Sequence, residues 1–261
     1  MILSGGTGSR MGATVPKQFL TLGDVPVLAH SVRTFLSWQP DASLVLTAPR
    51  EYLDETAELL RTHLGLNCAA QDTRNAVAEI QAERRQNATM TDNPSRSRKP
   101  VLIVPGGATR HASTMAGLTP LLQDADDADV ILIHDAARPL ITPDELNRLV
   151  RALDASRCSV ASLAAPASET IVEADAIPGP MQRSLDRSRL FAVKTPQALR
   201  AHTARTLMRN IPEGDFTDLL TWAMAGGEIG ELVMAENSNV KLTRAQDLPL
   251  LELLLSRSFF Q

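Results

Sequence analysis

The chain has 261 residues, of which 44% are hydrophobic and 21% charged, and its formal net charge is −4. This composition excludes a disordered or collagen-like protein, and the acidic balance disfavours a general nucleic-acid binder. No run of ~18 apolar residues is present, so a membrane-spanning helix is not expected. Two cysteines, Cys68 and Cys158, are too few for a disulfide scaffold or a zinc site. Without a signal-peptide pattern at its N-terminus, the chain is predicted to be cytoplasmic.

Short apolar runs alternate with amphipathic stretches along the chain. In chain order we expect a strand at Met1–Leu3, a helix at Val27–Trp38, a strand at Ser43–Thr47, a helix at Arg50–Leu64, a strand at Val101–Val104, a helix at Ala112–Leu122, a strand at Val130–His134, a helix at Pro143–Ala155 and a strand at Val160–Ala164. Runs that are apolar throughout are typical of strands buried on both faces of a parallel sheet. The alternation predicts a doubly wound, mostly parallel α/β sheet, which binds ligands at the carboxyl ends of its strands.

Two segments interrupt this pattern within what we expect to be a single domain over residues 1–261. Residues 67–100 are long and polar, which favours a solvated insertion over a basic contact strip. Residues 164–187 contain strand-like pieces and a Pro-Gly-Pro turn at 178–180, but no helical pattern. We therefore expect a β-arm that leaves the main sheet between about residues 164 and 187.

A glycine-rich turn follows the first predicted strand, with the sequence Ser-Gly-Gly-Thr-Gly-Ser-Arg-Met-Gly from Ser4 to Gly12. It lacks the lysine of a Walker A loop and the glycine spacing of a dinucleotide fingerprint. Glycine amides can approach an anion closely, and Arg10 lies within the turn. Lys17, in the sequence Pro-Lys-Gln-Phe, adds a second cation near the same position. The turn therefore predicts a phosphate-binding site.

These motifs resemble those of nucleotidyltransferases, and the rest of the chain is similar to one family, the 2-C-methyl-D-erythritol 4-phosphate cytidylyltransferases. The matching segments include Gly-Gly-Ala-Thr-Arg-His-Ala-Ser at 106–113, His-Asp-Ala-Ala-Arg-Pro at 134–139, Asp-Arg-Ser at 186–188, Thr-Pro-Gln at 195–197, Thr-Asp at 217–218 and Asn-Val-Lys-Leu-Thr at 239–243. They occur in the family's order and span nearly the whole chain outside residues 67–100. The resemblance implies a Rossmann-like fold in which the β-arm mediates dimerisation.

The resemblance also implies a site and its ligands. CTP and a polyol phosphate would bind to a homodimer with Mg²⁺, and neither nucleic acid nor membrane is an expected partner. The catalytic residues would be Arg10, Lys17 and Lys241. The nucleotide-binding residues would be Ser4, Gly5, Gly6, Gly8, Gly107, Arg110 and Ser113. The residues that bind the acceptor substrate would be Asp135, Arg138, Thr170, Arg187, Thr195, Thr217 and Asp218, with Asp135 also a metal ligand. Thr170 and Arg187 lie in the arm and would reach the partner's site.

Some of these residues also have simpler interpretations. Asp135 follows a predicted strand, where its carboxylate could hold Mg²⁺, cap a helix or pair with Arg138. Lys241 is expected at a strand end, and Thr217 could be a helix N-cap. His134 is expected to be a packed residue, since a phosphate nucleophile is already ionised and needs no strong base.

The predicted activity is transfer of a cytidylyl group from CTP to 2-C-methyl-D-erythritol 4-phosphate, with release of pyrophosphate. Two alternatives are a ribitol 5-phosphate cytidylyltransferase, whose glycine loop is similar, and a non-catalytic nucleotide-binding regulatory protein. Two positions differ from the family's usual pattern, because Lys194 replaces a glutamine and Leu219 an acidic residue. Both differences concern the acceptor end of the site.

Overall fold

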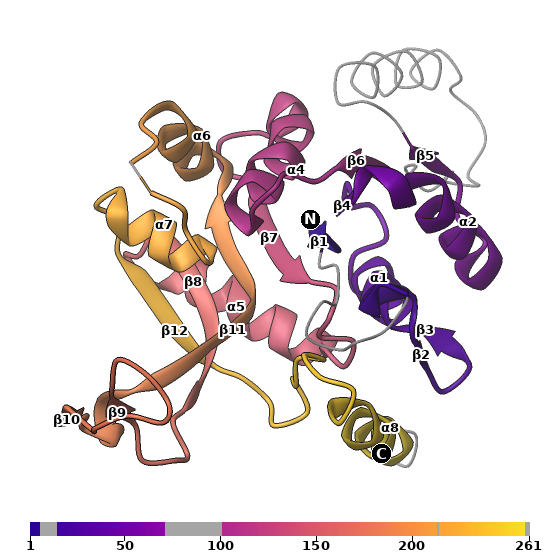
Figure 1. Cartoon of the computed structure of the whole chain (residues 1–261). Helices are drawn as coiled ribbons and strands as arrows, with labels where there is room; N and C mark the ends of the chain where they lie inside the picture. Colours follow the sequence, from indigo (N-terminus) through magenta and orange to yellow (C-terminus); the bar gives the residue numbers. More distant parts are fainter. Residues whose placement is uncertain (6–14, 71–100, 213, 259–261) are drawn as a thin grey trace.

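The computed structural model describes residues 1–5, 15–70, 101–212 and 214–258 (Figure 1). Among these residues, eight strands form one sheet, in the order β12 (Gly230–Met234), β8 (Val160–Pro166), β11 (Phe191–Arg200), β7 (Val130–Asp135), β1 (Ile2–Leu3), β4 (Val45–Ala48), β6 (Val101–Pro105) and β5 (Cys68–Ala70). Neighbouring strands are parallel, except that β11 is antiparallel to both β7 and β8. The predicted mostly parallel α/β fold is confirmed.

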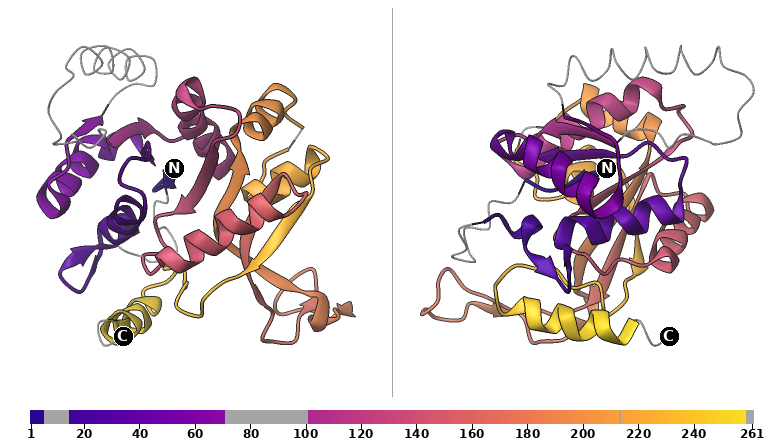
Figure 2. Two further views of the ribbon diagram at one scale, coloured as in Figure 1. Left: turned by 180° about the vertical axis from the view of Figure 1, so that it is seen from behind. Right: turned by 90° about the vertical axis from the view of Figure 1, so that its right-hand side faces the viewer.

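Helices pack on both faces of the sheet, as the two views of Figure 2 show. One face carries α1 (Val27–Trp38), α2 (Leu53–Leu64) and α5 (Pro143–Ala155), and the other carries α4 (Arg110–Asp124), α6 (Ala201–Arg209) and α7 (Leu219–Ala225). Alternate residues of a strand enter opposite cores: Leu132 packs with the first set of helices, and Ile131 and Ile133 pack with the second. Strands buried on both faces explain the continuous apolar runs in the sequence.

The helices begin where local sequence signals place them. The helix α5 has a capping box, in which the Thr142 hydroxyl accepts from the backbone of Glu145 and the Glu145 carboxylate accepts from the backbone of Thr142. The bounds of α1 and α5 agree with the prediction. The helix α4 begins two residues earlier than expected, because Thr109 caps it. The region predicted as one helix at 50–64 divides into a 3-10 turn, η3 (Arg50–Tyr52), and α2.

Three peripheral elements complete the part of the chain that the structure describes. The 3-10 turn η2 (Lys17–Phe19) leads into a hairpin of β2 (Thr21–Leu22) and β3 (Val25–Pro26). The C-terminal helix α8 (Asp247–Ser258) packs against this hairpin through Leu251 and Leu22. No helix in the described ranges is long and apolar enough to span a membrane.

The strand β11 lies inside the sheet between β8 and β7, although no strand was expected there from the sequence. Its register with β8 shifts between Val193 and Gln197, where Pro196 cannot donate a backbone hydrogen bond. Lys194 and Thr195 add polar character to the same stretch. A proline and polar residues obscure the strand pattern, and only the partners β7 and β8 reveal it.

The predicted β-arm is a two-stranded ribbon of β9 (Val172–Glu173) and β10 (Arg183–Ser184), followed by the 3-10 turn η4 (Arg187–Arg189). It projects from the body of the molecule between β8 and β11 (Figure 1). No crossover helix is needed here, since β8 and β11 are antiparallel. The arm carries exposed apolar side chains, and Ile177 is 98% exposed. Its role in dimerisation stays a prediction.

The polar segment at 67–100 begins differently from the prediction. Its first residues form β5, which pairs with β6 at the edge of the sheet and is therefore not part of a solvated insertion. Residues 71–100 lie outside the described ranges.

Candidate active site

A cavity of about 320 Å³ opens at the carboxyl ends of β1, β6 and β7, where a parallel α/β sheet places its ligands. The loops after these strands line it together with η2 and the segment between β12 and α8. The lining residues are Leu3, Ser4, Gly5, Lys17, Gln18, Gly107, Ala108, Thr109, Arg110, Ser113, Asp135, Ala136, Ala137 and Lys241. Eight predicted site residues, from segments far apart in the sequence, therefore meet in one cavity.

Asp135, the last residue of β7, holds two cations at the cavity wall. Its Oδ1 accepts hydrogen bonds from Nε and Nη2 of Arg110 at 3.2 and 2.9 Å, and its Oδ2 accepts from Lys241 Nζ at 2.6 Å. Burial would raise the pKa of Asp135, but the charges of Arg110 and Lys241 outweigh it and hold that pKa well below its usual range. The carboxylate is therefore ionised, and it fixes both cations in place.

The nucleotide end of the cavity presents backbone groups. Ser4 bonds to Thr47 through both its amide and its hydroxyl, at 2.9 and 2.7 Å, which ties the start of the glycine-rich turn to β4. The Gly107 amide donates to Ser113 Oγ at 3.1 Å. A Cβ at Gly107 would lie 2.3 Å from that of Ala112, so no larger residue fits this turn. The turn after β6 is thus held close to the start of α4.

A buried polar network lies next to Asp135, to which Thr195 connects it. Arg138 Nη1 donates to the carbonyl and side-chain oxygens of Asn239, at 3.2 and 3.3 Å. The Asn239 amide donates to Glu145 Oε1 and to the Thr195 carbonyl oxygen, both at 3.1 Å. Glu145 and Asn239 are both fully buried. Neither was predicted as a site residue, although Glu145 belongs to a recognisable capping box and Asn239 to a matched motif.

His134 is a structural residue, as expected, and it is fully buried beside Asp135. Its Nε2 lies 3.1 Å from the Arg138 carbonyl oxygen and its Nδ1 lies 3.4 Å from Thr195 Oγ1, which accepts from the Asp135 amide at 3.0 Å. Burial lowers the pKa of His134 to about 3, so the ring is neutral near pH 7. These contacts hold the backbone of Asp135 through Thr195.

The structure places the other predicted residues as follows. Lys17 Nζ donates to the Leu242 carbonyl oxygen at 3.2 Å, at the edge of the cavity. Lys241 does not lie at a strand end, because β12 ends at Met234 and an irregular segment joins it to α8. Gly6, Gly8 and Arg10 lie outside the described residues.

Six predicted residues do not line this cavity within the described chain. Two of them, Arg138 and Thr195, belong to the buried contacts beside Asp135 described above, and the other four lie elsewhere. Asp218 accepts from the Thr221 amide at 2.8 Å, so it caps α7, and the preceding Thr217 is exposed. Thr170 and Arg187 are exposed in the arm, where Arg187 Nη1 donates to the Ser168 carbonyl oxygen at 3.0 Å. The arm residues can belong to an active site only if a second chain brings one to them.

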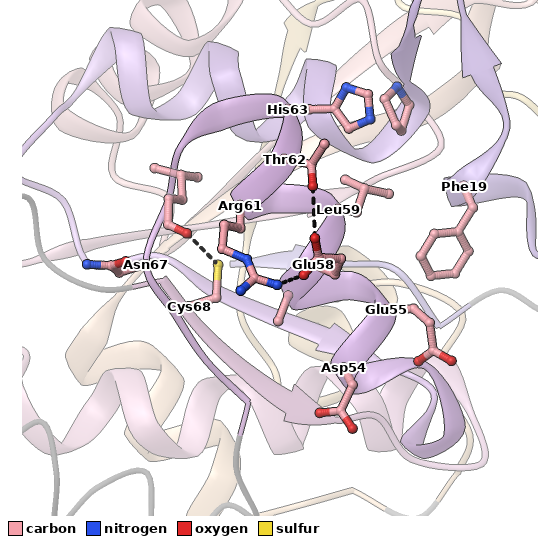
Figure 3. A pocket seen from close by; sticks show the side chains of 13 residues that line it. Phe19, Asp54, Glu55, Glu58, Leu59, Arg61, Thr62, His63, Asn67 and Cys68 are labelled. Carbon is pink, nitrogen blue, oxygen red and sulfur yellow. Dashed lines mark hydrogen bonds and ion pairs between the residues drawn. The ribbon is translucent and has the colours of Figure 1, made fainter.

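A larger cavity, of about 1130 Å³, lies beside α2 and β5 (Figure 3). None of the predicted residues lines it. Among its polar groups, Glu58 pairs with Arg61 and accepts from Thr62, as the dashed lines mark. Its Cys68 thiol is a poor nucleophile, since burial raises the pKa to about 11. The smaller cavity is lined by three cationic side chains, Lys17, Arg110 and Lys241, and is therefore the better candidate for binding an anion.

The described residues offer little to a resident metal ion. They contain no cluster of three or more His, Cys, Asp or Glu residues suited to one. Asp135 is the carboxylate at the cavity, and both of its oxygens already accept from cations. Mg²⁺ usually takes one or two carboxylates together with substrate phosphates. The donor set therefore fits Mg²⁺ only as an ion carried by the phosphates of a nucleotide, and Asp135 as a metal ligand stays a prediction.

An α/β sheet whose strand ends gather cations and backbone amides around one carboxylate is the arrangement of a nucleotidyltransferase. The family model described as 2-C-methyl-D-erythritol 4-phosphate cytidylyltransferase matches residues 1–257. The chain belongs to this family, which confirms the resemblance seen in the sequence.

Individual relatives agree with this assignment. A 2-C-methyl-D-erythritol 4-phosphate cytidylyltransferase from Leptospira interrogans serovar copenhageni is 34% identical and covers 98% of this chain and 91% of its own. The enzyme of that name from Cronobacter sakazakii is 31% identical and covers 98% and 93%. A crystal structure of 4-diphosphocytidyl-2C-methyl-D-erythritol synthase superposes with a TM-score of 0.69, at 24% identity over 97% of each chain. The cytidylyltransferase structure from Thermus thermophilus gives 0.63, at 22% identity over 98% and 97%. These two structures support the fold.

Proposed function

We propose that the cavity around Asp135 is where the phosphate of 2-C-methyl-D-erythritol 4-phosphate attacks the α-phosphorus of CTP. As a member of its family, the chain catalyses CTP-dependent cytidylyl transfer in the synthesis of isoprenoid precursors. A bond forms between the acceptor phosphate oxygen and the α-phosphorus, and the bond to the β-phosphate oxygen breaks. Pyrophosphate leaves, and 4-diphosphocytidyl-2-C-methyl-D-erythritol forms.

One observation carries this proposal: Asp135 holds Arg110 and Lys241 in fixed positions beside Lys17, where the cavity gathers three cations around a single carboxylate. Negative charge grows on the triphosphate as pyrophosphate leaves, and fixed cations stabilise it without reorganisation. A phosphate monoester is already an anion near pH 7, so the attack needs no general base. His134 is neutral and fully buried, and it has no role as a general base in this reaction.

The nucleotide would bind at the backbone groups of Gly5 and Gly107, with Ser113 beside them, and the acceptor at the Arg138 and Thr195 end. Small residues there leave room for a pyrimidine and little for a second ring. A magnesium ion bound to the triphosphate would supply further charge neutralisation. Arg10 keeps its predicted role near the triphosphate. Holding both substrates in line accounts for the rest of the rate.

Turnover assays test the reaction and the choice of substrates. CTP with 2-C-methyl-D-erythritol 4-phosphate should give pyrophosphate and the cytidylylated product. Ribitol 5-phosphate, the alternative acceptor, should react far more slowly, and ATP should be a poor donor. Lys17→Ala should lower kcat about 100-fold, the scale of one lost electrostatic contact. As a control, Arg148→Ala removes an exposed cation that pairs with Glu236 and should leave kcat unchanged. Equal turnover of both acceptors would contradict the assignment.

We further propose that the enzyme is a cytoplasmic homodimer whose arm brings Thr170 and Arg187 to the partner's cavity. The support is an arm with apolar residues exposed at its surface, Ile171 and Ile177 among them, which pairing would bury. Most symmetric soluble assemblies are two-fold dimers.

Mixing two inactive variants tests the shared site. Arg187→Ala and Lys17→Ala should each be inactive alone, and subunit exchange should restore activity. A mixed dimer would have one site with both lesions and one site with neither. An absence of recovery in samples shown to contain mixed dimers would rule out the shared site and place Arg187 in the pocket of its own chain.

A further inference from the structure

Lys194 is a residue to which neither the site prediction nor the reaction described above assigns a role. It occupies β11 next to Thr195, and its side chain is half-buried. Its Nζ donates to the carbonyl oxygen of Asn239 at 3.0 Å. The same oxygen accepts from Arg138 Nη1 at 3.2 Å. Two cationic nitrogen atoms therefore lie within 3.2 Å of one atom.

Neither cation of this pair forms a direct ion pair with a carboxylate among the described residues, although Glu145 attracts both of them and Asp135 attracts Arg138. The neighbouring acids serve other groups, because Glu145 accepts from the Asn239 amide and two backbone amides, and Glu236 pairs with Arg148. Both oxygens of Asp135 are also engaged. In addition, Arg138 is only 9% exposed, and its Nε is buried without a hydrogen-bond partner in the described structure. Buried charges usually have a partner, so this pair lacks an anion.

Burial, and then the charge of Arg138, lower the pKa of Lys194 from its ordinary value. An anion bound between the two cations would reverse the second effect and stabilise the charged lysine. A carbonyl oxygen orients both cations but does not neutralise them. The pair therefore has no anion bonded directly to it.

The position of the pair indicates which ligand completes it. Asn239 joins the pair to Thr195, whose hydroxyl accepts from the Asp135 amide, and Lys241 follows two residues later. The pair does not itself line the cavity, but these contacts join it to Asp135, which does. The turns at Gly5 and Gly107 belong to the nucleotide end, on the strands β1 and β6. The anion that completes the pair is thus a group of the acceptor.

We propose that Lys194, together with Arg138, binds the phosphate monoester of the acceptor substrate, and that Lys194 determines the preference of this enzyme for a doubly charged phosphate. This inference rests on the proposed acceptor and on its place in the cavity. The lysine adds a point charge to the planar fork of donors on Arg138, and a dianion can satisfy both at once. A glutamine at position 194 would keep a hydrogen-bond donor and lose the charge.

Steady-state kinetics with Lys194→Gln test this role. We expect the KM for 2-C-methyl-D-erythritol 4-phosphate to rise about tenfold, the scale of one charge-assisted hydrogen bond. The KM for CTP and kcat should stay within about threefold, and Lys194→Arg should retain most of the acceptor affinity. Arg148→Gln is the matched control, because it removes one cation that contacts the same segment and should leave the acceptor KM unchanged. An unchanged acceptor KM in Lys194→Gln, or an equal rise in the KM for CTP, would overturn the proposal.

The pH profile and a binding measurement separate this role from a structural one. The second ionisation of a phosphate monoester lies near pH 6, so the acceptor KM of the unaltered enzyme should fall between pH 5 and 7. Lys194→Gln should flatten this fall, and a profile identical to that of the unaltered enzyme counts against the proposal. Calorimetry with inorganic phosphate should show binding to the unaltered protein and weaker binding to Lys194→Gln. This measurement needs no turnover, so equal phosphate affinity overturns the proposal, while absent turnover with normal phosphate binding faults the proposed function alone.

Discussion

The buried ring of His134 makes a specific prediction about acid stability. The side chain is fully buried, and burial lowers its pKa to about 3. In the unfolded chain the pKa returns to about 6.5. Because the folded pKa is lower, protons bind preferentially to the unfolded chain below pH 6.5. The stability associated with the neutral ring is fully present above that pH and is lost as the pH falls from 6.5 towards 3.

The size of the loss follows from the two pKa values. Between them, each pH unit costs about 1.36 kcal/mol, since the unfolded chain carries one proton more than the folded chain. From pH 7.5 to pH 4.5 this single group should lower the free energy of unfolding by about 3 kcal/mol. That is a large share of the roughly 5–15 kcal/mol that stabilises an ordinary domain. Asp135 does not contribute in this window, because its depressed pKa matters only at lower pH.

Denaturant unfolding at a series of pH values measures this effect. His134→Gln removes the titrating group and keeps a donor for the Arg138 carbonyl oxygen, so its stability should vary by about 3 kcal/mol less over the window. As a control, His202→Gln replaces an exposed histidine and should retain the pH dependence of the unaltered protein. The comparison is between the slopes of the free energy of unfolding against pH. An overall loss of stability in His134→Gln therefore does not affect it. Parallel curves for the unaltered protein and His134→Gln would refute the reasoning.

Three further predictions concern the cavity and the polar segment. Asp135→Asn removes the charge that holds two cations in place, so kcat/KM should fall at least 100-fold, while Asp154→Asn, at an exposed carboxylate, should retain activity. Gly107→Ala should raise the KM for CTP about tenfold, because the new Cβ would lie 2.3 Å from that of Ala112 and must displace the turn; an unchanged KM would contradict the close packing. Deletion of residues 87–99 should leave kcat/KM within about threefold, because this polar stretch carries no matched motif, and a folded but inactive deletion variant would count against that view.

Local signals explain why so much of the fold could be predicted. The helices Val27–Trp38 and Pro143–Ala155 have the predicted bounds, since apolar periodicity and a capping box lie within the segments that they define. The five predicted strands are mostly apolar and differ from the prediction by one or two residues at their ends, whereas β5 and β12, which pair in parallel with β6 and β8, were not predicted. In contrast, β11 holds Lys194 and a proline in its middle, and its pattern resembles that of a loop until β7 and β8 pair with it.

By itself the sequence determined the mostly parallel α/β class, the order of the motifs and the family, because glycine turns, strand periodicity and short motifs are properties of neighbouring residues. Only the tertiary structure decided which groups form ion pairs and hydrogen bonds with one another. Asp135 and Lys241 are 106 positions apart, yet they form an ion pair at 2.6 Å, and Asn239 joins Arg138 to Lys194 across three separate segments. The charge of a site depends on such pairs, which form only when the sheet brings distant strand ends to one edge.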